Sequence, residues 1–191
     1  GPSGACISRG QLERAIAFYG PQDSETALNM SFLVLALART GAFADAESKA
    51  RESVRLARAK STLSASEVRG VVRRLGATLV LAGKPGDALA VLDPLLAEEV
   101  AAGQKDTRHA ATLMYRAGAL SMIGRHRDSL ASATESAEVW QRAGAAMGPG
   151  GKIGLAKARL TLALSWLSAG EPVQAEPLIT DVQAVIQAWT N

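Results

Sequence analysis

Apolar residues recur along most of the chain at spacings of three and four residues, which places them on one side of an α-helix. Residues 31–40, with the sequence SFLVLALART, are apolar around most of a helical circumference, which predicts a helix that packs against neighbours on two flanks. Gly41 interrupts this segment, and residues 45–60 resume with a narrow stripe of small residues and a charged opposite face. Because two helices joined by a turn of about three residues lie antiparallel, this region predicts a helical hairpin.

The same arrangement repeats along the chain. A glycine between two predicted helices is followed five residues later by a small residue, in the pairs Gly10 and Ala15, Gly41 and Ala46, Gly83 and Ala88, Gly124 and Ser129, and Gly170 and Ala175. Successive glycines are separated by 31, 42, 41 and 46 residues. A glycine permits the turn, and a small residue lets the following helix pack closely. Repetition at such intervals predicts an all-α solenoid built from antiparallel helix pairs.

Signals for the start of a helix support these boundaries. Pro85 and Pro172 each lie two residues after a turn glycine, where the first turn of a helix tolerates a residue without an N–H group. Ser64 and Glu67 have the spacing of a capping box, which predicts that a helix begins just after Ser64.

The composition agrees with a helical protein and excludes several other classes. The 191 residues include 37 alanines and 23 leucines, about a third of the chain in strong helix formers, and no stretch alternates apolar and polar residues long enough to predict a strand. The single cysteine, Cys6, excludes an internal disulfide and a zinc site made of four cysteines. The chain has no uncharged apolar run of about 18 residues, which a membrane-spanning helix needs, and it starts without the apolar segment of a signal peptide. We therefore expect a cytoplasmic protein.

At the repeated positions the chain resembles the tetratricopeptide repeat (TPR) family, in which large and small residues alternate on the first helix and a glycine and an alanine flank the turn. The residues that carry the resemblance are Met30, Leu33, Leu37, Gly41, Phe43 and Ala46 in the first unit, Leu75, Gly76, Leu79, Gly83, Ala88 and Leu92 in the second, Leu113, Ala117, Leu120, Gly124 and Ser129 in the third, and Leu162, Ala163, Trp166, Gly170 and Ala175 in the fourth. The intervals exceed the family's usual period of about 34 residues and resemble the long-period repeats of kinesin light chains and bacterial signalling proteins. The resemblance implies a right-handed superhelix whose first helices line a concave groove.

The repeat boundaries predict the domain organisation. Residues 1–4 resemble the remnant of a purification tag, and we expect residues 5–191 to form a single TPR-like helical-repeat domain. It would contain a half unit at residues 5–23 and units at about residues 27–62, 64–104, 106–146 and 152–190. The leading half unit suggests a piece of a larger protein.

The two histidines do not have the spacing of a metal site. His109 and His126 lie 17 residues apart, with no cysteine or carboxylate at metal-ligand spacing from either. We interpret both as exposed or capping residues and predict no metal.

No motif for catalysis is present. The sequence GPGGKIG at Gly148–Gly154 lacks the Ser or Thr that follows the lysine of a phosphate-binding P-loop, and it is interpreted as a flexible loop between repeats. The serines lack a GxSxG or SxxK motif, so we predict a protein that is not an enzyme and has no cofactor. The three tryptophans are interpreted as core anchors: Trp140, Trp166 and Trp189.

The TPR resemblance also indicates which side chains would line the groove and bind a partner. These are Arg39, Arg73, Ala77, Met114, Gly118, Met122, Lys157 and Leu164. Methionines adapt to irregular partners, and the cations favour acidic ones. We therefore expect a non-catalytic protein-interaction domain, a scaffold or sensor within a larger signalling protein, that binds a peptide or protein segment in its groove. The alternative is a regulatory domain that binds a small effector, as in multidomain bacterial transcription regulators.

Positive charge is concentrated between Lys49 and Arg74, although the net charge is only +3. This cluster is either a solvated helix face or an electropositive patch for an acidic peptide or nucleic acid. We expect a protein or peptide partner rather than nucleic acid, no contact with a membrane, and the option of a homodimer formed through an exposed end face.

Overall fold

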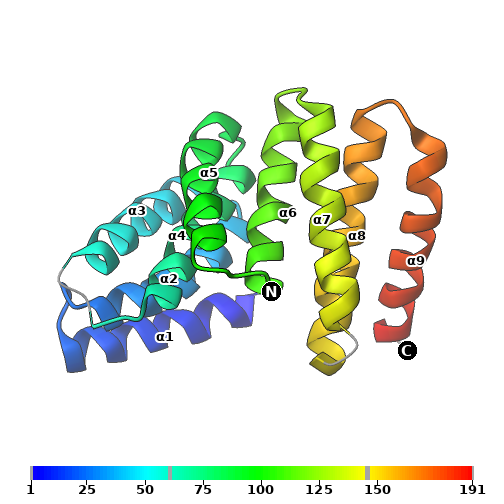
Figure 1. Cartoon of the computed structure of the whole chain (residues 1–191). Coiled ribbons are helices and arrows are strands. Elements are labelled where there is room, and N and C mark those ends of the chain that lie inside the picture. The colour runs from blue at the N-terminus through cyan, green and yellow to red at the C-terminus, as the bar shows by residue number, and fades with distance from the viewer. Residues whose placement is uncertain (1, 60–61, 145–146, 191) are drawn as a thin grey trace. The chain divides into compact units, whose positions relative to one another are not determined.

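The computed structural model describes residues 2–59, 62–144 and 147–190, and these residues form nine α-helices and no β-strand (Figure 1). The helices are α1 (Pro2–Tyr19), α2 (Ser24–Arg39), α3 (Phe43–Arg58), α4 (Ala65–Leu81), α5 (Pro85–Ala101), α6 (Thr107–Met122), α7 (His126–Gly144), α8 (Gly148–Ser168) and α9 (Pro172–Thr190). The predicted all-α class is confirmed for this part of the chain. Among the described residues, no helix is long and apolar enough to cross a membrane.

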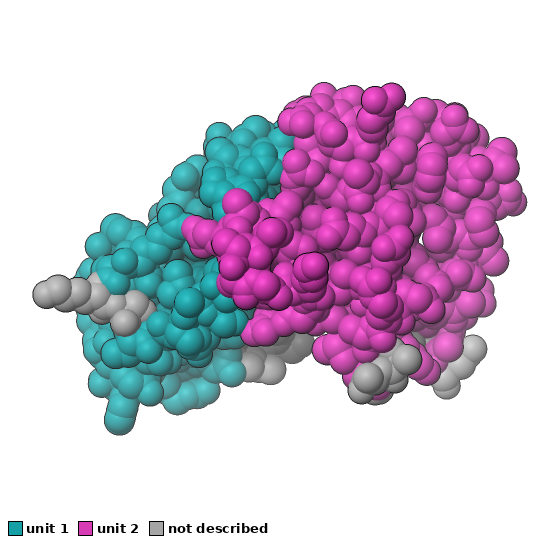
Figure 2. Space-filling model, viewed as in Figure 1, with its two compact units in different colours: residues 1–95 teal, residues 96–191 magenta. Residues whose placement is uncertain are grey.

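The helices fall into two compact units, residues 1–95 and residues 96–191, which Figure 2 colours separately. In unit 1, α2 packs against α1, α3 and α4, and α4 also packs against α3. In unit 2, α7 packs against α6 and α8, and α8 also packs against α6 and α9. Helices that follow one another thus form antiparallel pairs, and α4 and α8 each contact both helices of the pair before them.

Four of the five predicted turn glycines lie between helices. The backbone φ angles of Gly41, Gly83, Gly124 and Gly170 are 84°, 72°, 75° and 82°, a conformation that favours glycine. The small residues that follow them are fully buried: Ala46, Ala88, Ser129 and Ala175. The prediction is wrong for Gly10, which lies inside α1, and the turn after α1 is made instead by Gly20, with a φ of 90°.

The predicted helix starts are confirmed. α5 begins at Pro85 and α9 at Pro172. Before α4, the Ser64 hydroxyl accepts a hydrogen bond from the backbone N–H of Glu67, and the Glu67 carboxylate accepts one from the backbone N–H of Ser64. Both halves of the capping box are therefore formed.

Small residues allow the helices of a unit to approach closely. In unit 1, Ala57 of α3 belongs to a buried cluster with Leu63 and Val71. A Cβ added at Gly76 of α4 would overlap the side chain of Leu92 on α5, so these helices pack with no room for a larger residue.

The segment interpreted as a flexible loop, residues 148–154, is the first part of α8 in the structure, so that prediction is wrong. The reason is a contact made far away in sequence, because the indole of Trp140 on α7 lies against Gly154 and a Cβ there would overlap the ring. Tertiary packing stabilises a glycine-rich segment as helix, although its intrinsic propensity is low.

His109 is buried rather than exposed, which corrects the sequence-based interpretation. Its side chain lies on α6 with only 3% of its surface exposed, and its Nδ1 is 3.1 Å from Oε2 of Glu99 on α5. The Thr112 hydroxyl donates to the other carboxylate oxygen of Glu99 at 2.9 Å. Glu99 is itself fully buried, so both its oxygens have partners where an unpaired charge would be costly.

Candidate functional site

The predicted groove residues of unit 1 differ in accessibility. Arg39 is exposed at the end of α2, and Arg73 is half-buried on α4. Ala77 is fully buried, so the prediction that its side chain contacts a partner is corrected. It faces the interior of unit 1 because α4 contacts both α2 and α3 and has little free surface.

The predicted groove residues on α6 share one side of that helix. Met114, Gly118 and Met122 are spaced by four residues, and Met122 has 51% of its surface exposed. Leu164 of α8 lies at the repeat position of Gly118, because the two are separated by the same 46 residues as the turn glycines Gly124 and Gly170. Gly118 and Leu164 therefore occupy corresponding positions of two first helices, α6 and α8.

The helices α6 and α8 contact each other, and their C-terminal ends are joined by a hydrogen bond of 2.8 Å from the Ser121 hydroxyl to the Ser168 hydroxyl. Leu164 is 54% exposed and Leu167, one turn further along α8, is 43% exposed. We call the surface made by these side chains the α6–α8 face: Met114, Gly118, Met122, Leu164 and Leu167. Sequence reasoning missed Leu167, although its spacing of three residues from Leu164 places it on the same side of the helix.

Lys157 lies about two turns before Leu164 on α8. It lines a cavity of about 360 Å³ between α8 and α9, and we call this cavity the α8–α9 groove. The other lining side chains are all apolar: Ile153, Ala156, Leu160, Val182, Val185 and Ile186. Lys157 and Leu164 are seven residues apart, so both lie on the same side of α8, about two turns from each other along the helix.

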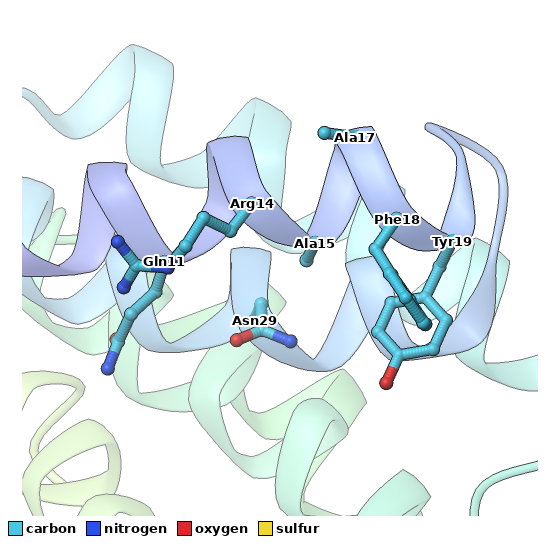
Figure 3. Close-up of a pocket in the computed structure, with 7 residues that line it drawn as sticks. All are labelled: Gln11, Arg14, Ala15, Ala17, Phe18, Tyr19 and Asn29. Atoms are coloured by element: carbon cyan, nitrogen blue, oxygen red, sulfur yellow. The ribbon is translucent and has the colours of Figure 1, made fainter.

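A wider pocket of about 660 Å³ lies over α1 and α2. Figure 3 shows Gln11 and Arg14 at one end, the rings of Phe18 and Tyr19 at the other, and Asn29 of α2 between them. The two rings meet edge to face with centroids 4.8 Å apart. The pocket thus combines polar groups with an exposed aromatic surface, since Phe18 is 81% exposed.

The positive cluster between Lys49 and Arg74 is not a bare cationic patch. Arg51 pairs with Glu47 at 3.0 Å and with Asp87 at 3.6 Å, and Arg55 pairs with Glu52. Lys84, in the turn between α4 and α5, also forms an ion pair with Glu47 at 2.7 Å. Its hydrogen bond is the main cause that lowers the pKa of the Glu47 carboxyl. These ion pairs favour a solvated helix face over an electropositive surface for nucleic acid.

Arg74 is partly withdrawn from the solvent. Its guanidinium lies 3.9 Å from the centre of the Phe32 ring and donates to the Ser31 hydroxyl at 3.1 Å. A cation held against an aromatic face in this way joins α4 to α2.

Comparison with known proteins finds solved structures of similar fold. No family profile matches the sequence, and no curated protein matches it. Among solved structures, BtubC (BKLC) from P. vanneervenii is 14% identical with a TM-score of 0.58, over 100% of this chain and 92% of that chain. MamA from Desulfovibrio magneticus RS-1, from residue 41 to the end, is 16% identical with a TM-score of 0.57, over 97% and 96% of the two chains. MamA AMB-1 is 18% identical with a TM-score of 0.57, over 98% and 97%.

Identities this low carry the fold alone. The chain has the TPR-like solenoid fold of antiparallel helix pairs, as the repeated turn glycines and the resemblance predicted. The long-period subtype stays a prediction from the sequence.

Proposed function

We propose that this chain is a non-catalytic protein-interaction module that binds an extended or helical segment of a protein partner on the α6–α8 face. The observation that supports the proposal is the exposure of Met122, Leu164 and Leu167 on two adjacent helices. Large apolar side chains gathered on one surface mark interaction sites more often than scattered ones do. Met122 adds a flexible side chain that adapts to the shape of a partner.

A selection of short peptides from a displayed random library tests this proposal. We expect selected peptides to bind with micromolar dissociation constants, and Leu164→Asp or Met122→Asp to weaken them by at least about tenfold. Val100→Asp is the matched control, because Val100 is 60% exposed but lies on α5, outside the α6–α8 face. Peptides that bind the Leu164→Asp variant as tightly as the unchanged protein would contradict the assignment.

Charge would set the preference among partners. Among the cations predicted to favour acidic segments, Lys157 is exposed and lies on the same helix, α8, as Leu164 and Leu167. Peptides recovered by the selection should be enriched in Asp and Glu, and their affinity should fall as salt concentration rises. The resemblance to long-period repeats supports a place for this module within a larger cytoplasmic signalling protein, which sequencing of the parent gene and cell fractionation would test.

The second candidate is the binding of a small effector in the pocket over α1 and α2. Its volume of about 660 Å³ lies within the range of ligand sites, and Arg14, Gln11 and Asn29 offer hydrogen bonds beside the two aromatic rings. A thermal-shift screen of metabolites should then find a compound that raises the melting temperature, and Arg14→Ala should abolish that shift. A compound that stabilises the Arg14→Ala variant equally would exclude this pocket.

A further inference from the structure

The α8–α9 groove differs from the α6–α8 face because it lies between the two helices of one pair. Its lining is apolar apart from Lys157, and two of its side chains are strongly exposed, Leu160 at 42% and Ile186 at 57%. An apolar groove between two helices can accommodate the apolar side of a third helix.

The repeat itself shows what such a site holds. One position of the second helix is occupied by Ala57, Glu99, Trp140 and Ile186, because these residues are separated by the same 42, 41 and 46 residues as the turn glycines. At the first three, the side chain contacts the helix that follows. Ala57 lies with Val71 of α4, Glu99 with His109 of α6, and Trp140 with Gly154 of α8.

Ile186 departs from this pattern. Trp140 is covered by α8, and its neighbour Val139 is only 5% exposed, whereas Ile186 remains open to solvent among the described residues. The α8–α9 groove therefore corresponds, one repeat later, to the surface of α6 and α7 that α8 covers. A helix placed there would run parallel to α8 and antiparallel to α9, as α8 does with respect to α6 and α7 (Figure 1).

The charges of the two helices that form the groove are opposite. α8 carries Lys152, Lys157 and Arg159 and no acidic residue, whereas α9 carries Glu176 and Asp181 and no basic residue. Arg159 donates to Asp181 at 2.9 Å, which fixes how the two helices align. Lys152 and Lys157 have no acidic side chain within ion-pair distance among the described residues. An occupant of the groove should therefore present carboxylates as well as an apolar stripe.

We propose that the occupant is α9 of a second copy of this chain, in a two-fold symmetric dimer. α9 has the required apolar stripe in Val182, Val185 and Ile186, and its only charges are acidic. In a two-fold dimer the same patch serves as both surfaces, so α9 of each copy fills the groove of the other. The two α9 helices are then antiparallel, which is the orientation that the repeat requires.

The alignment of α8 and α9 predicts which charges meet. Because Arg159 and Asp181 lie at the same height, Lys157 lies level with residue 183 of α9. A two-fold axis that passes near residue 183 brings Asp181 of the second copy to within about 3 Å of Lys157 along the helix axis. It brings Glu176 of the second copy equally close in height to Lys152.

The experiment is sedimentation velocity on the whole chain at concentrations up to about 100 µM. We expect a species of twice 19.8 kDa that dissociates on dilution. Ile186→Asp should weaken the dimer at least about tenfold, since it places a carboxylate in the apolar groove. Val173→Asp is the control, because Val173 is also on α9 and 75% exposed but does not line the groove. Circular dichroism would show that both variants keep their helices.

Charge exchange distinguishes a second copy from any other occupant. Lys152→Glu and Glu176→Lys should each weaken self-association, because each creates like charges at both symmetric contacts. An equimolar mixture of the two variants should restore it, since every contact in the mixed dimer again joins opposite charges. A monomer at the highest concentration, a dimer unaffected by Ile186→Asp, or a mixture no stronger than its components would overturn the proposal. Capture of a helix from another protein, or of a further segment of the same chain, would also overturn it if the purified chain stays monomeric.

Discussion

The contact between Gly154 and Trp140 predicts that Gly154→Ala destabilises the protein, although helix propensity alone predicts that it stabilises the protein. Replacing a glycine inside a helix by alanine ordinarily stabilises the helix by about 0.5–1 kcal/mol. At Gly154 the added Cβ would overlap three atoms of the rigid Trp140 ring, which is held between α7 and α8. Overpacking of a close contact costs about 1–3 kcal/mol. We therefore expect Gly154→Ala to lower the free energy of unfolding by about 1–2 kcal/mol.

Gly150 supplies the matched control. It lies in the same helix and is exposed, with no atom within 4 Å of an added Cβ, so Gly150→Ala should be neutral or stabilising by up to about 1 kcal/mol. Urea denaturation followed by circular dichroism measures both variants. Combining Gly154→Ala with Trp140→Leu should cost less than the sum of the two single changes, because the smaller side chain removes the overlap. If Gly154→Ala were as stable as Gly150→Ala, close packing would not be the reason that this glycine-rich segment is helical.

Three further predictions concern buried and capping groups. Thr112→Val should destabilise the chain by about 1–3 kcal/mol in urea denaturation, because it removes the hydroxyl that donates to the buried carboxylate of Glu99, whereas Thr134→Val at an exposed position should have little effect. Ser64→Ala should cost about 0.5–2 kcal/mol and increase hydrogen exchange in the first turn of α4, since it removes the capping box. Burial raises the pKa of Asp106, but hydrogen bonds from the side chain and backbone of Arg108 and the backbone of His109 outweigh it and lower the pKa from 3.8 to about 2. Asp106 therefore stabilises the fold above about pH 4 and loses this contribution as the pH falls towards 2, so acid denaturation of Asp106→Asn should depend less on pH in that range.

Features decided by local chemistry could be predicted from the sequence. A turn that needs a positive φ is marked by a glycine, as at Gly41 and Gly83, and a helix start is marked by the capping box at Ser64. The same local pattern at Gly10 was misleading. There α1 continues through the glycine, and Leu12 and Ala15, which follow it, are buried. Local sequence does not distinguish a glycine in a turn from one in a helix whose neighbours are buried by another element.

Features decided by contacts between distant residues could not be read in this way. His109 gives no local sign of Glu99, which precedes it by ten residues across the turn at Gly103. The helical state of residues 148–154 depends on Trp140, on a different helix. The groove residues were chosen from first helices alone, so the sequence did not predict that Lys157 also lines a groove made with α9.

One repeat position, held by Ala57, Glu99, Trp140 and Ile186, predicts that the repeats of this solenoid are not interchangeable. Ala57 packs in the apolar cluster with Leu63 and Val71. The buried Glu99 carboxylate contacts His109 and Thr112, and the Trp140 indole contacts Gly154. Moving α8 onto the pair that holds Glu99 would bury the carboxylate without the hydroxyl and imidazole that contact it. Moving α6 under Trp140 would bring Arg108, which is at the repeat position of Gly154, into the space of the ring. Each mismatch carries a cost of burial or overlap, so we expect each second helix to pack best with its own successor. By the same reasoning Ile186 selects an apolar helix without a buried polar group, and the apolar side of α9 meets that requirement.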